Sequence, residues 1–213
     1  LDALTSLRGL AAWWVVLYHT RSVLKPHISA DFMAFVKNGD LAVDMFFVLS
    51  GFVMYLSYSS RISRSFSSVQ DFLYKRFARV YPLHFFILLC FLVYVTAFFF
   101  YSRELPGKYS STYFLQSLFL VQNWGISDGL QWNVPAWSIS TEFFAYLCFP
   151  ALVFFLKFRE WPTWVLGTTL VVTALGLHLY FRVLGFNFTG GIEQTGLLRC
   201  VAQFFMGMIL CVI

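Results

Sequence analysis

The stretch that decides the fold is YPLHFFILLCFLVYVTAFFFYS, residues 81–102, which contains one histidine and no formally charged residue. A helix needs about 20 consecutive apolar residues to cross the hydrocarbon core of a bilayer. This run is long enough, and so is a similar run at 163–181. Apolar residues make up 59% of the chain and charged residues 12%, whereas soluble domains have about 45–50% and about 25%. The sequence therefore predicts an all-α, polytopic transmembrane helical bundle.

We expect about 6–7 apolar segments in all, separated by charged or turn-rich breaks. Besides residues 81–102, they are 4–20, 39–58, 113–124, 137–156, 163–184 and 197–213. The run 113–124 is short for a crossing, so it is either a tilted span or a re-entrant segment. We expect Pro82 to begin a helix, where its missing N–H costs nothing, and Pro150 to break one.

The ends of the chain suggest a fragment. The sequence begins without a methionine and stops inside an apolar run. We therefore expect a single transmembrane domain, residues 1–213, that is truncated on its C-terminal side.

Basic residues indicate the orientation of the bundle. The connection 59–79 contains Arg61, Arg64, Lys75, Arg76 and Arg79. Cytoplasmic loops concentrate Lys and Arg, so we place this connection and the N-terminus in the cytoplasm and residues 21–37 outside. Two alternatives remain further along: Lys157 and Arg159 lie outside if 113–124 crosses the membrane, and inside if it does not. No basic stripe interleaves with aromatic residues, so the net charge of +5 does not indicate a nucleic-acid partner.

Ionisable residues within membrane spans are costly and are candidates for function. The expected spans contain Arg8, His19, Asp40, Asp44, His84, Glu142, His178 and Arg182. Arg8 and His19 are eleven residues apart, so they share one face of a helix and lie about 16 Å apart along its axis. The alternative interpretation is that Arg8 reaches lipid headgroups and His19 marks the end of the span.

Two further pairs have helical spacing. Arg76 and Arg79 are three residues apart, and two guanidinium groups on one face can clamp a pyrophosphate. An ordinary basic flank of a membrane span is the alternative. Asp40 and Asp44 are four residues apart and need a cationic partner if both are ionised.

Glu142 follows an unusually polar start of an apolar run, WSISTE. Helix N-capping by Ser138 or Ser140 would explain the hydroxyl groups, but it explains Glu142 less easily.

Several other chemistries lack their sequence patterns. The chain contains no G-x-S-x-G, P-loop, H-E-x-x-H or Cys-x-x-Cys motif. Its four cysteines all lie in apolar runs, without the spacing of zinc ligands or of a disulfide framework. We therefore expect no metal site.

Four stretches carry a resemblance to a known family. They are LTSLRGLAAWWVVLYH (4–19), LAVDMFFVLSGFVM (41–54), KRFARVYP (75–82), and LVQNW (120–124) followed by WSISTEFFAYLCFP (137–150). Together, and in this order, they resemble the acyltransferase-3 family of bacterial membrane acyltransferases, which includes polysaccharide O-acetyltransferases. The resemblance covers residues 4–150.

The resemblance implies a multi-pass enzyme of the bacterial inner membrane. It would move an acyl group from cytoplasmic acyl-CoA, expected to be acetyl-CoA, to a hydroxyl of an extracytoplasmic or lipid-linked glycan. The implied catalytic residues are Arg8, His19, Asp44 and Glu142, and the implied CoA-binding residues are Arg76, Arg79 and again Arg8. His19 would act as a base or as a transient acyl carrier. Phe143 stands where family members often have a second acid.

Two other classes of function remain open from the residues. A transporter or permease would line its pathway with the same intramembrane charges, and it would move a substrate without cleaving a thioester. A membrane sensor or scaffold is the third alternative.

Overall fold

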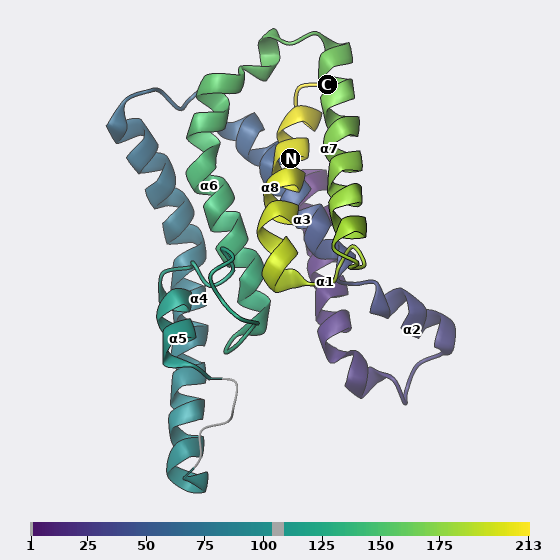
Figure 1. Cartoon of the computed structure of the whole chain (residues 1–213), viewed down its shortest axis with the longest axis vertical. Helices are drawn as coiled ribbons and strands as arrows, with labels where there is room; N and C mark the ends of the chain where they lie inside the picture. The colour runs from purple at the N-terminus through teal and green to yellow at the C-terminus, as the bar shows by residue number, and fades with distance from the viewer. Residues whose placement is uncertain (1, 104–108) are drawn as a thin grey trace. The chain divides into compact units, whose positions relative to one another are not determined.

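The structure is a computed structural model, and it describes residues 2–103 and 109–213. Every regular element in these two ranges is a helix, which confirms the all-α prediction (Figure 1). The α-helices are α1 (Asp2–Leu24), α2 (Ala30–Lys37), α3 (Leu41–Tyr58), α4 (Phe66–Ser102), α5 (Ser111–Leu118), α6 (Trp137–Leu156), α7 (Thr163–Val183) and α8 (Ile192–Leu210). Short 3-10 turns, Val134–Ala136 and Phe158–Glu160, flank α6.

Four helical segments of the described residues are long and apolar enough to cross a membrane. They are Leu41–Tyr58, Phe66–Ser102, Val134–Glu160 and Thr163–Val183. The expected spans 4–20 and 197–213 are also helical, within α1 and α8, which have 23 and 19 residues and contain charged side chains. The chain is therefore a multi-pass membrane protein, and the expected 6–7 segments are an approximate count.

Helix α4 differs from the prediction because much of the basic connection is helical. The helix begins at Phe66, where the Ser65 hydroxyl accepts a hydrogen bond from the Ser68 amide at 3.3 Å. Its 37 residues extend about 55 Å at about 1.5 Å each, whereas the hydrocarbon core is about 30 Å thick. The basic first part of α4 thus continues the membrane span beyond the hydrocarbon.

Both proline predictions were wrong. Pro82 lies inside α4 and Pro150 inside α6, rather than at a start or a break. A proline within a helix removes one backbone hydrogen bond, which membrane helices tolerate where neighbouring groups satisfy the freed carbonyl. A proline in an apolar run therefore does not locate a helix end.

The short run 113–124 does not cross the membrane. It contains the end of α5, whose eight residues span only about 12 Å. Leu120 then has a left-handed backbone with φ of 57°, which ends the regular structure. The Tyr81 hydroxyl donates to the Leu118 carbonyl at 2.9 Å, and His84 Nε2 lies 2.8 Å from the Ser117 carbonyl oxygen. These contacts fasten α5 to the side of α4.

The chain divides into two compact units. Unit 1 contains Leu1–Ser57, Trp161–Thr189 and Ala202–Ile213, and unit 2 contains Tyr58–Glu160 and Gly190–Val201. The expectation of a single transmembrane domain stays a prediction.

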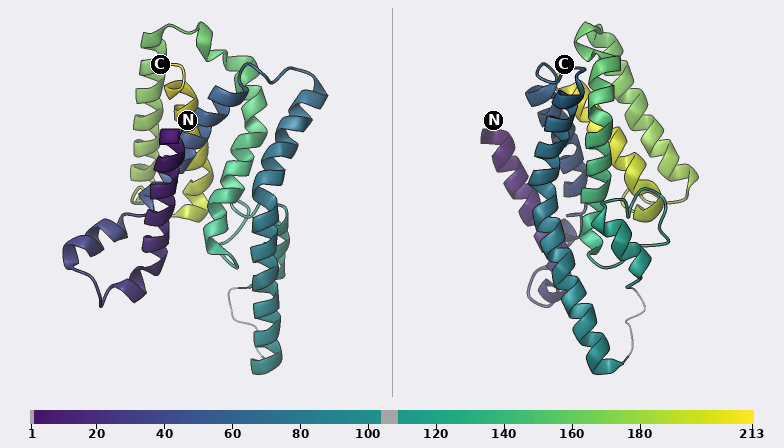
Figure 2. Two further views of the ribbon diagram at one scale, coloured as in Figure 1. Left: turned by 180° about the vertical axis from the view of Figure 1, so that it is seen from behind. Right: turned by 90° about the vertical axis from the view of Figure 1, so that its left-hand side faces the viewer.

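Within unit 2, α4 and α6 are antiparallel neighbours (Figures 1 and 2). The contacts run in opposite directions along the two helices: Phe72 stacks on Phe149 at 5.1 Å between ring centroids, and the later Phe77 meets the earlier Phe143 edge-on at 6.2 Å. Before α4, Arg64 Nη2 donates to the Phe154 carbonyl at 3.3 Å. The last turn of α6 therefore lies beside the first turn of α4.

This pairing decides the position of the second basic segment. Arg159 Nη2 donates to the Ser59 hydroxyl at 3.4 Å, so Lys157 and Arg159 lie at the same end of unit 2 as the connection 59–79. Of the two alternatives for these residues, the structure selects the one in which 113–124 does not cross. Five basic residues of the connection 59–79 then lie at one end of unit 2 with Lys157 and Arg159, whereas Arg103 follows α4 at the other end. This bias is of the kind that the positive-inside rule describes.

Within unit 1, α3 and the second half of α8 cross at glycines. A Cβ on Gly51 would collide with the Phe204 carbonyl, and one on Gly207 would collide with the Val48 carbonyl. Small residues allow such close backbone approach between membrane helices. Gly39, just before α3, packs in the same way against α1, where an added Cβ would lie 2.6 Å from the Trp14 carbonyl oxygen.

Candidate functional site

Arg8 and His19 both lie on the continuous helix α1, as their shared-face spacing requires. Arg8 is half-buried and His19 is exposed on this chain. The His19 ring meets the Tyr18 ring edge-on at 5.2 Å. The nearby cation is Arg21, which stacks 4.1 Å over the Tyr18 ring and donates to the Tyr18 carbonyl at 2.6 Å. The imidazole is therefore accessible for chemistry at the last turn but one of α1.

Asp44 lies in the first turn of α3 and is half-buried. Its carboxylate accepts a hydrogen bond from the side-chain amide of Gln203, a buried residue of α8. The sequence suggested a cationic partner for Asp44. A pairing of that kind stays a prediction, and Gln203 is the partner that the structure adds.

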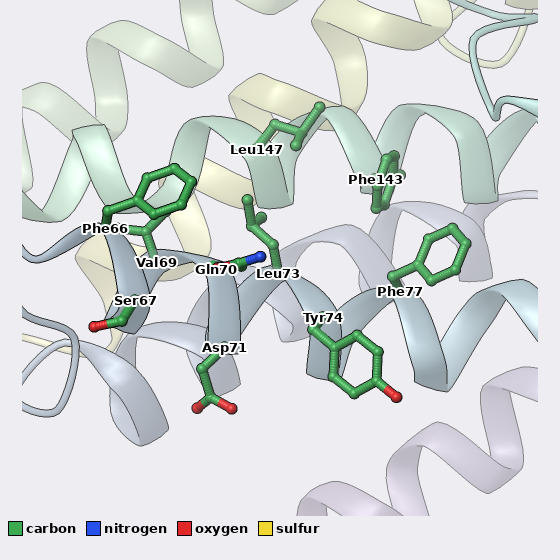
Figure 3. Close-up of a pocket in the computed structure, with 10 residues that line it drawn as sticks. All are labelled: Phe66, Ser67, Val69, Gln70, Asp71, Leu73, Tyr74, Phe77, Phe143 and Leu147. Atoms are coloured by element: carbon green, nitrogen blue, oxygen red, sulfur yellow. The ribbon is translucent and has the colours of Figure 1, made fainter.

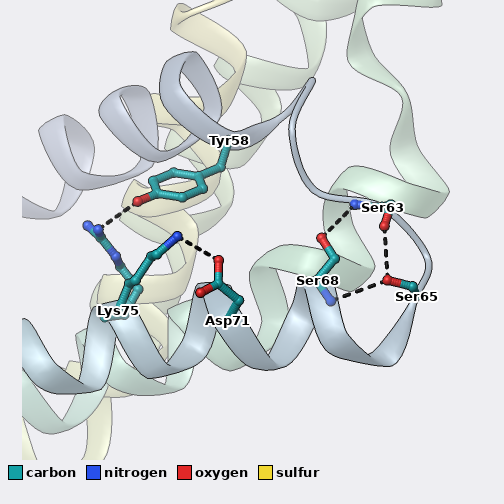
Figure 4. Close-up of polar contacts among 7 residues, drawn as sticks. Tyr58, Ser63, Ser65, Ser68, Asp71 and Lys75 are labelled. Atoms are coloured by element: carbon teal, nitrogen blue, oxygen red, sulfur yellow. Dashed lines mark hydrogen bonds and ion pairs between the residues drawn. The ribbon is translucent and has the colours of Figure 1, made fainter.

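Arg76 and Arg79 share α4 but differ in burial. Arg76 is buried, its Nη2 donates to the Tyr58 hydroxyl at 2.8 Å, and its guanidinium carbon lies 5.0 Å from the Tyr58 ring centroid. Figure 4 shows Tyr58 above the start of α4, near the 2.6 Å ion pair of Lys75 with Asp71. Arg79 is exposed. Arg76 is thus anchored in the protein, while Arg79 is accessible to a ligand.

An apolar groove of about 590 Å³ lies between the first half of α4 and α6 (Figure 3). The rings of Phe66, Phe77 and Phe143 line it together with Leu147, and Asp71 lies at its margin. Sequence reasoning did not predict this groove because it depends on the pairing of two helices.

Glu142 lies one turn into α6, where a polar seam joins α6 to the first half of α8. We define the seam as Thr141, Glu142 and Tyr146 of α6 with Arg199 and Cys200 of α8. Glu142 accepts a hydrogen bond from the Tyr146 hydroxyl at 2.6 Å. The Cys200 thiol hydrogen-bonds the Thr141 side chain and lies within the electrostatic field of Glu142. The seam brings together a carboxylate, a guanidinium, two hydroxyls and a thiol.

The serines before Glu142 do not cap α6, so that interpretation was wrong. The residue that precedes the helix is Ala136, without a side-chain cap. The buried Ser140 hydroxyl instead donates to the Leu120 carbonyl at 2.8 Å and accepts from the Asn123 amide at 3.3 Å. Ser138 donates to the Pro135 carbonyl at 3.1 Å. These hydroxyls fix the loop after α5 against α6.

Helix α5 and the loop that follows it form a small buried core at the end of unit 2 opposite the connection 59–79. Tyr113 and Trp132 are buried, and the Trp132 indole donates to the Ser110 carbonyl at 2.9 Å. Burial raises the pKa of the Tyr113 phenol above its usual value, partly opposed by a hydrogen bond with the Gln131 backbone. Residues 109–136 contain no Lys or Arg. Arg103 at the C-cap of α4 lies on this side as well, so this end of unit 2 has fewer basic residues than the end with the connection 59–79.

The described residues hold no candidate metal site. Among residues 2–103 and 109–213, no three His, Cys, Asp or Glu side chains are grouped as metal ligands would be.

Comparison with known proteins places the chain in a family. The profile described as an acyltransferase domain, Acyl_transf_3, matches residues 1–213. The chain belongs to the acyltransferase-3 family. The resemblance of the four sequence stretches is thereby confirmed, and with it the assignment to a family of acyltransferases.

The curated relatives of this chain include the following three acyltransferases. Acyltransferase MdmB of Streptomyces mycarofaciens is 35% identical over 156 residues, which cover 70% of this chain and 38% of the relative. Peptidoglycan O-acetyltransferase OatA of Listeria monocytogenes is 27% identical, over 82% of this chain and 27% of the relative. O-acetyltransferase OatA of Staphylococcus aureus is 29% identical, over 84% of this chain and 29% of the relative.

These relatives are much longer than the chain, which spans only between about a quarter and two fifths of their length. No solved structure matches the chain significantly.

Sequence reasoning missed two polar residues of α8. Arg199 and Gln203 are buried, and the apolar run 197–213 contains both. The signal was available for Arg199, because an arginine within an apolar span is a functional candidate by default. Gln203 had no comparable signal, since an uncharged amide is common on helices and only the approach of α3 reveals its partner.

Proposed function

We propose that the protein is a membrane O-acyltransferase. It transfers an acyl group, in the simplest case acetyl, from cytoplasmic acyl-CoA to a hydroxyl group of an extracytoplasmic or lipid-linked glycan. The observation that carries the proposal is the family match over the whole chain. The name of the Listeria relative, a peptidoglycan O-acetyltransferase, supports a glycan acceptor.

The donor binds at the basic end of unit 2. Arg64, Arg79 and Arg159 are exposed there, and Arg76 lies one helical turn before Arg79. The phosphates of CoA are polyanionic, and guanidinium groups bind phosphate oxygens in a bidentate manner. Arg76, held by Tyr58, supplies a fixed cation, and Arg79 supplies an accessible one. The family resemblance also assigns Arg8 of α1 to the donor.

His19 performs the transfer chemistry. The acceptor hydroxyl loses its proton, its oxygen forms a C–O bond with the acyl carbon, and the C–S bond of the thioester breaks. The proton ends on the CoA thiolate. His19 either relays this proton as a general base or carries the acyl group between donor and acceptor. Asp44 and Glu142 support the charges that develop, in line with the family resemblance.

In the proposed orientation, the basic end of unit 2 and the N-terminus face the cytoplasm of a bacterial inner membrane. The seven basic residues of 59–79 and 157–159, against Arg103 and Lys108 in the sequence after α4, favour this direction. Single cysteines at the exposed positions Ser60 and His27, in a background without the native cysteines, test it with an impermeant thiol reagent. Intact cells should label His27→Cys and leave Ser60→Cys unlabelled. The reverse pattern would invert the orientation.

The decisive experiment supplies the full-length protein in proteoliposomes with acetyl-CoA labelled on the acetyl group. The proposal predicts release of free CoA and label in a hydroxyl ester of an added glycan acceptor. The transporter alternative predicts movement of label across the membrane with the thioester intact. His178→Ala is a matched control, since this histidine is exposed on α7 and lies outside the proposed site. Intact thioester in the presence of acceptor would overturn the proposal.

A further inference from the structure

Arg199 is a charged side chain that the proposed chemistry does not yet use. It lies on α8 within unit 2 and is 1% exposed, which makes it one of the largest fully buried side chains of the described residues. A guanidinium group cannot lose its charge inside a protein. Its burial in an apolar bundle therefore requires compensation by polar or anionic groups.

The surroundings of Arg199 are set by a close approach of α8 to the start of α6. Its guanidinium carbon lies 5.8 Å from the ring centroid of Trp137, the first residue of α6. Gly196, three residues earlier, allows this approach: a Cβ there would lie 3.2 Å from the Trp137 ring and 2.6 Å from Asn123 Nδ2. Because Gly196 has no side chain, α8 comes close to α6, and Arg199 packs against the Trp137 ring in the first turn of α6.

The adjacent residue on α8 identifies the acid that faces this step. Cys200 hydrogen-bonds the Thr141 side chain and lies in the field of Glu142 as well as of Arg199. Arg199 and Cys200 of α8 therefore lie opposite Thr141 and Glu142 of α6. The Tyr146 hydroxyl donates to Glu142 at 2.6 Å, and Tyr146 itself is buried, so this carboxylate has a fixed position on the seam.

Of the other acids that the structure describes in unit 2, two pair with lysines and two line a separate cleft. Asp71 pairs with Lys75 at 2.6 Å and Glu160 with Lys157 at 3.2 Å, both on the exposed surface. Asp128 and Glu193 line a polar cleft between the loop after α5 and the first turn of α8. Glu142 is thus the acid suited to balance the charge of Arg199.

We propose that Arg199 is the counter-ion of Glu142 and a positioning residue that orients this carboxylate across the α6–α8 seam. The pairing itself stands on the contacts of the seam, and only the effect on transfer rests on the proposed function. Removal of one member of a buried charge pair leaves the other uncompensated, whereas removal of both leaves no charge to compensate. The pair therefore predicts strong non-additivity between substitutions at the two positions.

The experiment is a double-mutant cycle on the full-length protein in detergent. Glu142→Gln and Arg199→Met are each expected to lower the melting temperature by at least about 5 °C. The double variant should melt within about 2 °C of wild type. Arg182→Met is the matched control, because this arginine is exposed on α7, and it should leave the melting temperature unchanged. A double variant whose loss equals the sum of the two single losses would overturn the pairing.

Transfer kinetics test the positioning role separately. Arg199→Met should lower kcat about 100-fold with an unchanged donor KM, as loss of orientation at a catalytic group does. The double variant should regain stability but not kcat. Arg199→Lys keeps the charge and should recover the melting temperature and part of kcat. If Arg199→Met transfers with the wild-type kcat, the positioning role is wrong. Absence of transfer by wild type contradicts the proposed function alone, because the melting cycle still decides the pairing.

Discussion

Helix α1 and the α6–α8 seam hold their functional candidates in opposite ways. On α1, His19 is exposed and Arg8 is half-buried, so neither side chain is enclosed by the chain around it. On the seam, Arg199 and Tyr146 are buried, and Glu142 is fixed by a hydrogen bond. A substitution on α1 should therefore change chemistry without changing folding, whereas a substitution on the seam should change both. This contrast separates residues that act on a ligand from residues that position others.

The largest effect is expected for His19→Ala. Loss of a general base or an acyl carrier lowers transfer by about 10²- to 10⁴-fold, while the melting temperature stays the same because the side chain is exposed. The assay measures labelled ester formed by equal amounts of purified protein, with His178→Ala as control. Near-normal transfer by His19→Ala would contradict the catalytic role of this exposed residue.

The second effect concerns the packed crossing of α3 with α8. Gly51→Ala places a Cβ against the Phe204 carbonyl and should lower the free energy of unfolding by about 1–3 kcal/mol. Gly9→Ala on α1 is the matched control, since an added Cβ there meets nothing within 4 Å. The comparison measures melting temperature and membrane abundance of the two variants. Equal stability for both would contradict the close crossing.

A smaller effect is expected for Asp44→Asn. Asp44 is half-buried, between the exposed His19 and the buried Arg199. The amide oxygen of asparagine still accepts a hydrogen bond from Gln203, so the protein should accumulate normally. Loss of the negative charge should lower transfer about tenfold if Asp44 acts electrostatically. Asp40→Asn, one turn earlier, is the control. Full transfer by Asp44→Asn at normal abundance would leave Asp44 as a packing residue.

The smallest effect compares an exposed and a buried arginine, Arg79 and Arg76, within one turn of α4. Arg79→Ala should raise the donor KM about 2- to 5-fold and leave the melting temperature unchanged, because an exposed charge contributes little. Arg76→Ala should raise KM and also lower the melting temperature, since it removes the buried contact with Tyr58. Donor titrations and thermal melts of both variants measure the difference. An unchanged KM in both would remove these arginines from the donor site.

Long apolar runs were the easiest features to predict. The boundaries 137–156 coincide with α6, and 163–184 differs from α7 by one residue. An apolar run of that length crosses a bilayer as a helix, since a helix satisfies every backbone hydrogen bond within itself. Helix α2 was missed, although Ser29 accepts a hydrogen bond from the Phe32 amide as an N-cap. Eight residues in a polar connection give too weak a pattern to distinguish a helix from a loop.

Composition and local motifs were enough to assign the class of the protein, its family and the candidates Arg8, His19, Asp44 and Glu142. The tertiary structure decided which polar groups meet. It alone placed Lys157 and Arg159 at the end of unit 2 that holds the connection 59–79. It also gave Asp44 the amide of Gln203 and set Arg199 opposite Glu142. These partners are from 57 to 159 residues apart along the chain, and helical periodicity carries no information about the rotation of one helix against another.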